Sequence, residues 1–568
     1  MTRPTAAEQL IAIGREAPLF HAPDATAYAT VPVGEHQETW ALRSSGFKSW
    51  LAGTLWHRNR QIVRSQVLQD VLTTLEAVAR FEGPEQAVFV RLAVTKGATY
   101  LDLGDEAWRA VEVTAHGWQI VARPPVRFRR PKGLAPIPDP ARGGHLDALR
   151  SFLNLEGDDD RWVLIVGFLV GALRNGPYPV LVLGGEQGSA KTTASRMLRG
   201  LVDPATSPDR AAPRDERDLA IAATNAHVVA YDNLSHLSDW LSAALARLAT
   251  GAGFGTRQLY LDDEEKLFYS ARPVIINGIG ELAVRSDLLD RALLVTLPPI
   301  PKAKRRLESE LWPAYEEARP AILGALLDVV STAMRRYPNV RPPRLPRMAD
   351  LATWITAAEP ALGWEHGTFL AAYDRNRLDA HDLALDAASI TASLKDLVAA
   401  ADWQGTATAL LATLTSLAGE TLIRRKDWPA APNVLSGQLK RLAPDFRAIG
   451  IEIDCDAREP GTGVRSIRIR RIGPQETVTI VTPVTNTDAP ENPADDRDAR
   501  DDDPRRESHR GARGTVGSPQ PAPDPEDRGD AAQVAAARGV DIEADYPASA
   551  WRIDDESVTE ADSQVPWR

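Results

Sequence analysis

The sequence predicts a multidomain α/β protein whose centre is a three-layer phosphate-loop (P-loop) domain, and three observations support this fold class. The chain has 568 residues, the length of about three or four domains. Between about residues 145 and 300, nearly continuous apolar runs alternate with helical stretches, which is typical of a parallel sheet covered by helices on both faces. A glycine-rich loop, Gly185–Thr193, directly follows one of these runs.

The composition excludes several classes of protein. The 43% hydrophobic and 25% charged residues are those of a globular protein with buried cores. The single cysteine, Cys455, excludes a disulfide framework and a zinc site with several cysteines. The most apolar window, Trp162–Leu173, has 12 residues, too few to span a bilayer, and the N-terminus lacks the apolar run of a signal peptide. We therefore expect a cytoplasmic protein without a membrane segment.

The chain is expected to divide into seven segments. Alternating apolar residues between turn signals predict an antiparallel meander in the first domain, and a Pro- and Gly-rich stretch after it predicts a linker. The predicted segments are an N-terminal extension (1–17), an α+β accessory domain (18–133), a linker (134–144), the P-loop ATPase domain (145–300), a helical segment (301–400), a winged-helix-like domain (401–473) and a disordered acidic tail (474–568).

The negative net charge of the protein comes from the predicted C-terminal tail. Residues 475–568 contain 22 Asp and Glu against 10 Arg, a net of −12, and subtracting this from the total of −11 leaves +1 for the rest of the chain. A segment so rich in Pro, Asp and Gly cannot bury enough apolar surface to offset the entropy of ordering, so disorder is predicted. The tail is either simply solvated or competes with nucleic acid for a basic surface.

The strongest chemical signal is the loop GEQGSAKTT. It differs by one residue from the G-x4-G-K-[ST] phosphate loop, because Ala190 replaces the last glycine. In such a loop successive backbone N–H groups face phosphate oxygens, and the following helix adds the positive end of its dipole. The predicted ATP-binding residues are Gly185, Gly188, Ser189, Ala190, Lys191, Thr192 and Thr193. We expect Lys191 to reach the β- and γ-phosphates, Thr192 to offer its hydroxyl to Mg²⁺, and Ala190 to adopt a right-handed helical conformation.

A second element is needed to hold the metal, and the strand predicted over residues 226–231 supplies it. This strand ends at Asp232, and a carboxylate at the C-terminal end of the strand adjacent to the loop strand is a Mg²⁺ ligand in P-loop ATPases. The next residue, Asn233, can position a water molecule but cannot take its proton. Asn277 ends a third strand at the corresponding level. The alternative is that Asp232 and Asn277 only form turns.

Together these motifs resemble the ATPase core of superfamily 3 helicases and the poxvirus and phage primase-helicase group within the AAA+ class. The resemblance implies that Asn277 senses the γ-phosphate, and that Arg285 or Arg291 acts as an arginine finger on the nucleotide of a neighbouring subunit. The predicted catalytic residues are therefore Lys191, Asp232, Asn233, Asn277, Arg285 and Arg291. The two arginines could instead form surface ion pairs with the aspartates between them. The glutamate that usually follows the metal aspartate is missing, so hydrolysis is either slow or uses another acid, such as Glu186 or the group 262–265.

A hairpin between the metal strand and the third strand strengthens this resemblance. Two β-rich runs around Arg257 and Lys266 flank an acidic turn. In helicases of this type such a hairpin points into the ring channel and grips DNA, which makes Arg257 and Lys266 candidate phosphate contacts. They could instead pair with the acids of the turn.

The motifs YDNLSHLSDWLS, ATGAGFGTRQLY and RSDLLDRALLVTLPPI are also similar to those of bacterial ATP-binding proteins of phages and integrative elements. This resemblance spans about residues 18 to 473.

The C-terminal pattern of two helices and a hairpin predicts a winged helix. Residues 420–472 hold 11 Arg and Lys against 7 Asp and Glu. Arg468 and Arg470 fall on one face of a strand, and Lys440 lies on the expected recognition helix, so these three cations are candidate DNA contacts. The alternative is a protein-binding winged helix with a solvated arginine-rich edge.

The leading functional hypothesis is an ATP- and Mg²⁺-dependent DNA helicase or primase-associated motor that replicates a mobile element. We expect a homo-oligomer, as a hexamer, acting on single-stranded or forked DNA. The alternative is an ATP-dependent switch or an origin-binding initiator with slow hydrolysis and no unwinding. Primase catalysis is not expected, because residues 1–145 show no paired-aspartate palm motif.

Overall fold

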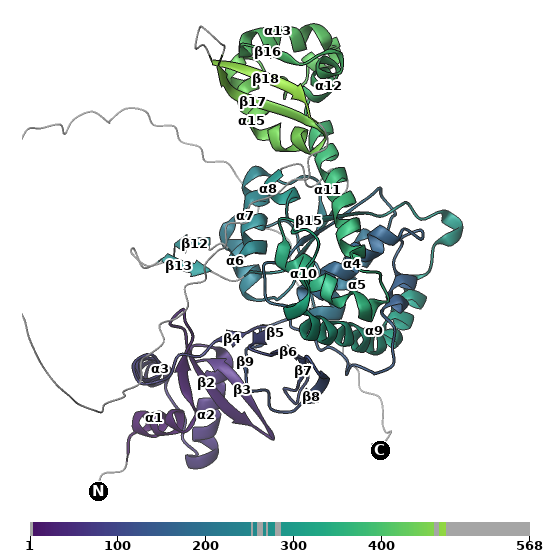
Figure 1. Ribbon diagram of the computed structural model, residues 1–568. Coiled ribbons are helices and arrows are strands. Elements are labelled where there is room, and N and C mark those ends of the chain that lie inside the picture. The colour runs from purple at the N-terminus through teal and green to yellow at the C-terminus, as the bar shows by residue number, and fades with distance from the viewer. Residues whose placement is uncertain are drawn as a thin grey trace, which may run out of the picture. The chain divides into compact units, whose positions relative to one another are not determined.

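Five groups of helices and strands follow one another along the chain (Figure 1). The computed structural model describes residues 4–251, 254–257, 265–268, 271–278, 286–458 and 465–472, all within the unit Met1–Val484. The predicted acidic tail and the predicted arginine finger Arg285 lie outside these residues. Helices combined with parallel and antiparallel sheets confirm the multidomain α/β class. Among the described residues, no helix is both long enough and apolar enough to cross a membrane.

The first group is a three-stranded antiparallel sheet packed against three helices. Its elements are α1 (Ala6–Glu16), β1 (Leu19–His21), β2 (Ala27–Val33), β3 (His36–Ala41), α2 (Ser45–Asn59) and α3 (Ser65–Phe81). A capping box begins α1, because Thr5 Oγ1 accepts the Glu8 N–H at 3.3 Å and the Glu8 carboxylate accepts the Thr5 N–H at 2.7 Å. Leu10 of α1 is buried with Leu51 and Leu72 of α2 and α3. The residues expected to form an extension therefore contribute a helix to this core.

The second group contains the antiparallel meander that the sequence predicts. Its strands are β5 (Leu92–Thr95), β6 (Ala98–Asp102), β7 (Ala110–Thr114) and β8 (Gly117–Val121), beside a short parallel pair of β4 (Val88–Phe89) and β9 (Arg127–Phe128). The meander shares its core with the next group. Trp118 of β8 is buried in one cluster with Leu323 of α9, and its Nε1 donates to Asp328 Oδ1 at 2.9 Å.

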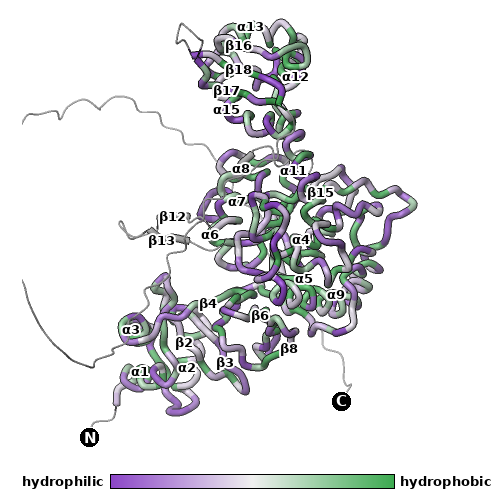
Figure 2. The backbone as a smooth tube through the Cα atoms, viewed as in Figure 1, coloured by the Kyte–Doolittle hydropathy of each residue, from purple (hydrophilic) through white to green (hydrophobic). Residues whose placement is uncertain are grey.

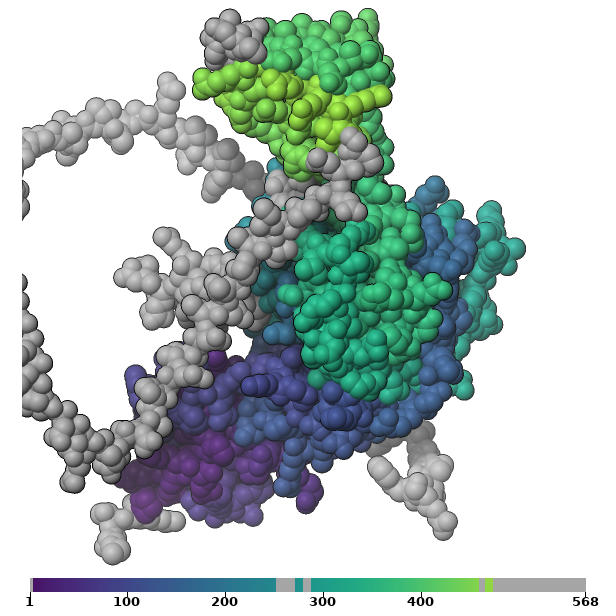
Figure 3. Space-filling view, in the orientation of Figure 1, coloured from purple at the N-terminus to yellow at the C-terminus, as the bar shows by residue number. Residues whose placement is uncertain are grey.

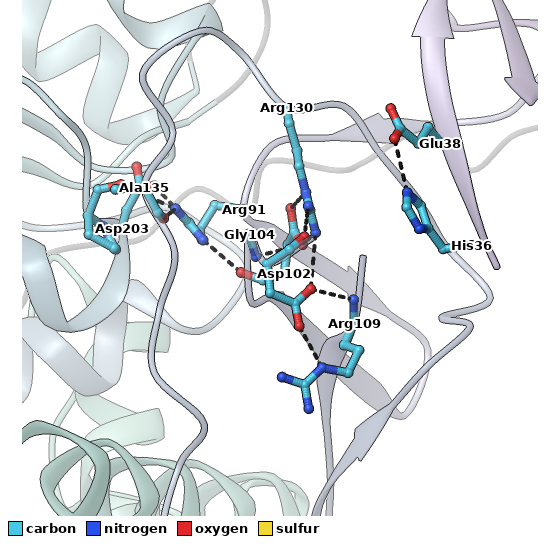
Figure 4. Close-up of polar contacts among 11 residues, drawn as sticks. His36, Glu38, Arg91, Asp102, Gly104, Arg109, Arg130, Ala135 and Asp203 are labelled. Atoms are coloured by element: carbon cyan, nitrogen blue, oxygen red, sulfur yellow. Dashed lines mark hydrogen bonds and ion pairs between the residues drawn. The ribbon is translucent and has the colours of Figure 1, made fainter. Parts of the chain in front are cut away.

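A buried ion pair also joins the meander to the central domain (Figure 4). Arg91 Nε lies 3.0 Å from Asp203 Oδ1, just after helix α5. The other guanidinium nitrogens donate to the carbonyl oxygens of Asp102 at 2.8 Å and of Ala135 at 2.5 Å. The Asp102 carboxylate in turn accepts a hydrogen bond from Arg130 at 2.6 Å. These contacts fix the end of α5 to the accessory domain.

The central domain is built on a parallel sheet in the order β11-β14-β10-β15. Its strands are β10 (Val180–Gly184), β11 (Val229–Leu234), β14 (Val274–Gly278) and β15 (Ala292–Thr296), and its first helices are η1 (Leu146–Phe152), α4 (Asp159–Ala172), α5 (Lys191–Val202), α6 (Glu216–Thr224), α7 (Asp239–Thr250) and α8 (Ser286–Leu289). Both faces of the sheet are covered. Leu181 and Leu183 face the core formed with α4 and α5, whereas Val180 and Val182 face the core formed with α6, α7 and α8. This is the arrangement that near-continuous apolar strands require.

Helix α4 is apolar around its whole circumference because protein surrounds it. Asp158 begins the helix by accepting the Arg161 N–H at 3.0 Å. Every residue from Trp162 to Ala172 is buried, and most of these residues are hydrophobic, which is green in the colouring of Figure 2. The apolar window that is too short to span a bilayer is therefore a core helix.

A helical group follows the sheet. It consists of η2 (Lys302–Lys304), α9 (Glu308–Arg336), η3 (Tyr337–Asn339), α10 (Ala349–Ala358), η4 (Glu359–Leu362) and α11 (Thr368–Ala387). In the space-filling view these helices form much of the visible face of the central domain, in teal to green (Figure 3). Helix α11 belongs to three cores: Phe369 and Tyr373 pack with α4, α9 and α10, Ala380 and Ala384 pack with the sheet, and Leu385 packs with the C-terminal group.

The C-terminal group combines four helices with a three-stranded antiparallel sheet. Its elements are α12 (Thr391–Ala400), β16 (Trp403–Gly405), α13 (Ala407–Leu417), α14 (Glu420–Ile423), α15 (Pro432–Ala448), β17 (Ile451–Arg458) and β18 (Arg465–Arg471). The strand order is β16-β18-β17. Strand β17 alternates strictly, with Ile451, Ile453 and Cys455 inward and acidic residues between them.

Candidate functional site

The loop between β10 and α5 has the backbone that a phosphate cradle needs. Gly185 has a φ of +135°, and a Cβ there would lie 2.3 Å from the carbonyl oxygen of Leu297, so only glycine fits. Gly188 also lies in the left-handed region, with a φ of +83°. Ser189 is buried, and its hydroxyl donates to the Glu186 carbonyl at 2.9 Å, which holds the loop closed.

Lys191 begins α5 and folds back over this loop. Its Nζ donates to the carbonyl oxygens of Gly185 at 2.8 Å and Glu186 at 2.7 Å, and to Ser189 Oγ at 3.3 Å. Burial lowers the pKa of Lys191, and the nearby Asp232 carboxylate partly offsets this. The ammonium group is therefore placed inside the curve of the loop, where a bound phosphate would lie.

Ala190 does not have the conformation expected from the sequence. It adopts the left-handed region, with φ +65° and ψ +30°, rather than a right-handed helical one. The chain turns into α5 at this residue, and this turn requires a positive φ. The glycine that usually occupies the position adopts such a φ easily. A left-handed conformation costs an L-residue about 1–2 kcal/mol, so the loop is strained here. Thr193, half-buried, follows in the first turn of α5.

Thr192 and Asp232 meet at the C-terminal edge of the sheet. Thr192 Oγ1 donates to Asp232 Oδ1 at 2.9 Å. Mg²⁺ takes octahedral ligands at about 2.0–2.1 Å, which places neighbouring ligands about 2.9 Å apart, so this oxygen pair fits one corner of a Mg²⁺ shell. A cluster of three or more His, Cys, Asp or Glu side chains suited to a metal is absent from the described residues. In ATPases, Mg²⁺ is usually held by one or two protein side chains and takes its other ligands from phosphate and water.

The strand that carries Asp232 is not next to the loop strand. Strand β14 lies between β10 and β11, so the expectation of an adjacent strand was wrong. The inserted strand brings Asn277 between the two, paired in register with Leu183 of β10. Sequence order could not reveal this, because a parallel sheet permits several strand orders for the same succession of strands.

The side chain of Asn277 is bonded to the backbone of Asn233. Asn277 Oδ1 accepts the Asn233 N–H at 3.1 Å, and the Asn277 Nδ2 is buried without a partner among the described residues. This leaves the N–H donors of Nδ2 available for a ligand. Asn233 has a φ of +55° at an irregularity of β11, and its side chain is exposed. Asparagine tolerates this left-handed conformation better than most residues, which gives a backbone reason for the amide at this position.

The sequence did not single out two further features of the site. Asn154, between η1 and α4, donates from Nδ2 to the Pro298 carbonyl at 2.5 Å and to the Ser189 carbonyl at 3.4 Å, so it ties the loop to the end of β15. A cleft of about 690 Å³ lies beside Asp232 and is lined by Arg196, Arg210, Arg214, His236 and Trp240, among others. Neither feature has a local motif, because each joins segments far apart in the chain.

The arginine-finger candidates lie away from this edge or outside the described residues. Arg291 precedes β15, and its carbonyl accepts the Val180 N–H at 2.9 Å, at the start of β10. The loop leaves the other end of β10, so Arg291 lies at the opposite edge of the sheet from the phosphate loop of its own chain. Arg285 lies outside the described residues.

The predicted hairpin has antiparallel backbone pairing. Strands β12 (Phe254–Arg257) and β13 (Glu265–Phe268) pair so that Arg257 faces Glu265 and Thr256 faces Lys266 in register. The acidic turn 258–264 lies outside the described residues, as does most of the acid group named as an alternative water activator.

The basic residues of the C-terminal group are largely matched by acids. Lys440 of α15 pairs with Asp456 at 3.1 Å, and Arg470 pairs with Glu452. Arg468 donates to Gln404 at 3.3 Å. The expected basic stripe therefore faces acidic residues of β17, because cross-strand pairing places Glu452 and Asp454 opposite the two arginines. Arg468 and Arg470 do share one strand face, as the alternation predicted.

Comparison with known families decides what kind of protein this is. The family model of the actinomycete integrative conjugative element replication protein matches residues 146–383, and the model of the C-terminal domain of the same protein, AICE RepA, matches residues 387–484. Together these ranges cover more than half of the chain. The chain belongs to this family of replication proteins. The family match confirms the resemblance to proteins of integrative elements.

Other comparisons give weaker likenesses to this replication protein. No curated protein matches it in sequence. Among solved structures, one titled "SCCmec type IV Cch – active helicase" is 10% identical with a TM-score of 0.42, over 80% of this chain and 94% of that one. The C-terminal region of NrS-1 is 9% identical with a TM-score of 0.36, over 83% of this chain and 100% of that one.

Proposed function

We propose that this replication protein is an ATP-driven DNA motor, a helicase that acts in the replication of its mobile element. The observation that carries the proposal is the meeting of three strand ends. Lys191 and Thr192 follow β10, Asp232 lies near the C-terminal end of β11 within hydrogen-bond distance of Thr192, and Asn277 lies near the C-terminal end of β14, between them. This is the arrangement of residues that binds and positions a nucleoside triphosphate with Mg²⁺ in P-loop ATPases.

Each residue has a distinct task in this proposal. The Gly185–Ala190 loop surrounds the phosphates with backbone N–H groups, and Lys191 neutralises the charge that develops on the transferred phosphoryl group. Thr192 and Asp232 would hold Mg²⁺, which supplies Lewis-acid stabilisation of the phosphate oxygens. Asn277 donates from its free Nδ2 to the terminal phosphate or to the attacking water.

A complete site requires a second subunit. Because Arg291 lies at the opposite edge of the sheet, its guanidinium can stabilise the transition state only on the nucleotide of a neighbouring chain. Arg285 has the same proposed role. A closed ring of identical subunits, proposed here as a hexamer, satisfies this geometry at every interface.

We assign DNA binding to the hairpin β12–β13 and to the C-terminal group. The order α12-β16-α13-α14-α15-β17-β18, with strands arranged β16-β18-β17, supports a winged helix with α15 as its recognition helix. Lys440, Arg468 and Arg470 would exchange their intramolecular partners for phosphates, and single-stranded or forked DNA is the proposed substrate. Arg257 and Lys266 are the proposed contacts of the hairpin.

A second candidate function rests on Asn233. Its left-handed conformation places an exposed amide where a motor would carry a proton-accepting carboxylate. An ATP-held switch or origin-binding initiator would use the same site with slow hydrolysis and no unwinding.

Turnover of ATP with and without single-stranded DNA separates these functions. We expect wild-type turnover to rise several-fold with DNA and to vanish in Lys191→Ala, whereas Lys96→Ala, which removes an exposed lysine of the β5–β6 turn, keeps it. ATP binding with negligible turnover under both conditions would exclude the motor and favour the switch. Absence of ATP binding by the wild-type protein would exclude both.

A further inference from the structure

A cluster of basic residues follows β15 on the same edge of the sheet as the phosphate loop. The segment Pro301–Leu307 reads PKAKRRL, and all of its residues are exposed. Lys302, Lys304, Arg305 and Arg306 have no ion pair with any residue that the structure describes. Four neighbouring cations without acidic partners among the described residues give this segment a positive potential, which attracts anions.

The chain that leads to this segment is attached to the phosphate loop. The Leu297 N–H donates to the Gly184 carbonyl at 2.9 Å, and the Ile300 N–H donates to the Gly188 carbonyl at 3.2 Å. The short helix η2 then reverses the chain, with the Lys304 N–H donating to the Pro301 carbonyl at 2.9 Å. The basic segment is therefore held beside the loop by backbone contacts.

After this reversal of the chain, the side chain of Arg305 lies beside the phosphate loop. Its Nη2 lies 3.8 Å from the position that a Cβ on Gly188 would occupy, and no other described heavy atom outside the neighbouring residues lies within 4 Å of that point. Lys191 occupies the inner side of the loop, bonded to the carbonyl oxygens of Gly185 and Glu186. The two cations thus flank the loop, one on its inner side and one beside its tip.

We propose that Arg305 binds the terminal phosphate of the nucleotide held by the loop of its own chain. A guanidinium offers a planar fork of N–H donors that matches phosphate oxygens two at a time, and the terminal phosphate has the highest charge to neutralise. Lys302, Lys304 and Arg306 raise the local positive potential. The inference rests on the proposed nucleotide site, and it adds a cation in cis to the arginines of the neighbouring subunit.

Binding of ATP and ADP with Mg²⁺, measured by calorimetry, tests this role. We expect Arg305→Ala to weaken ATP binding at least ten-fold, with a smaller loss for ADP, and Arg305→Lys to recover only part of the affinity, because lysine lacks the fork. Arg80→Ala is the control: it removes an exposed arginine of α3 in the accessory domain and is expected to leave ATP affinity unchanged. Equal ATP affinity in Arg305→Ala and wild type would overturn the proposal, as would equal losses for ATP and ADP.

Mixing inactive variants distinguishes action in cis from action in trans. At an ATP concentration too low to saturate Arg305→Ala, mixing this variant with Lys191→Ala gives no turnover above that of the separate variants if Arg305 serves its own loop, because every subunit lacks one of the two cations. Restored ATP turnover in this mixture would overturn the assignment in cis. Arg291→Ala mixed with Lys191→Ala is the positive comparison, since a residue acting on the neighbouring subunit can be complemented. Failure of wild-type protein to bind ATP would instead disprove the nucleotide site itself, which separates the two hypotheses.

Discussion

Replacing Arg91 by leucine tests how firmly the accessory domain holds the P-loop helix. Arg91 is fully buried, with Nε 3.0 Å from Asp203 Oδ1 and two further donors on the carbonyl oxygens of Asp102 and Ala135 (Figure 4). Asp203 directly follows α5, the helix that begins at Lys191. The substitution therefore leaves a buried carboxylate without its cation at the end of that helix.

The size of the effect follows from what remains around Asp203. Burial by itself would raise the pKa of Asp203, but Arg91, Arg199 and His227 outweigh it and hold the pKa below its usual value, so the group is charged. Without Arg91 the carboxylate still accepts the backbone N–H groups of His227 at 2.8 Å and Val228 at 2.9 Å. Breaking a buried pair costs about 3–5 kcal/mol. Because these two donors remain, the expected loss is about 3 kcal/mol, or about 6–12 °C in melting temperature.

Thermal unfolding of the full chain measures this loss against a matched control. Arg15→Leu breaks an exposed ion pair with Glu82, whose atoms are 3.1 Å apart, and is expected to cost less than about 1 kcal/mol. The double variant Arg91→Leu/Asp203→Asn removes both charges and should lose less than the sum of the single variants. A melting temperature of Arg91→Leu as high as that of Arg15→Leu, or strict additivity in the double variant, would refute the reasoning.

Three further predictions concern single residues. Burial lowers the pKa of His227 to about 4, so the unfolded state takes up a proton at a higher pH than the folded state does. The free energy of unfolding should therefore fall as the pH drops from about 6.5 to 4, by at most about 3 kcal/mol. In His227→Gln, the melting temperature should depend less on pH between about pH 7.5 and 5. Relief of the left-handed strain makes Ala190→Gly neutral or up to about 1 kcal/mol stabilising, whereas Ala190→Val should lower both melting temperature and ATP affinity. His381→Ala leaves buried Asp445 without its 2.8 Å partner and should destabilise the C-terminal group by about 1–3 kcal/mol, seen as faster proteolysis there; an unchanged cleavage pattern would contradict this.

The local chemistry of the candidate site could be predicted from the chain alone. A strand, the GEQGSAKTT loop and a helix follow one another directly in the sequence. This succession can be predicted because it depends on the backbone conformations of residues that are neighbours in the chain. The apolar strands that end in Asp232 and Asn277 are equally local, and their parallel pairing follows from apolar runs separated by helices. The antiparallel meander β5–β8 was also predictable, since its strands alternate and their turns are short.

Contacts between distant segments were decided only by the tertiary structure. The insertion of β14 between β10 and β11, the approach of Arg305 to Gly188 and the Arg91–Asp203 pair each join residues that no sequence motif links. The same holds for Arg470, whose acidic partner Glu452 was set by strand register. The sequence by itself determined which residues have the chemistry to bind a triphosphate, because that chemistry is encoded locally. Folding decided which of them meet, because strand order and side-chain pairing depend on how whole elements pack to bury their apolar faces.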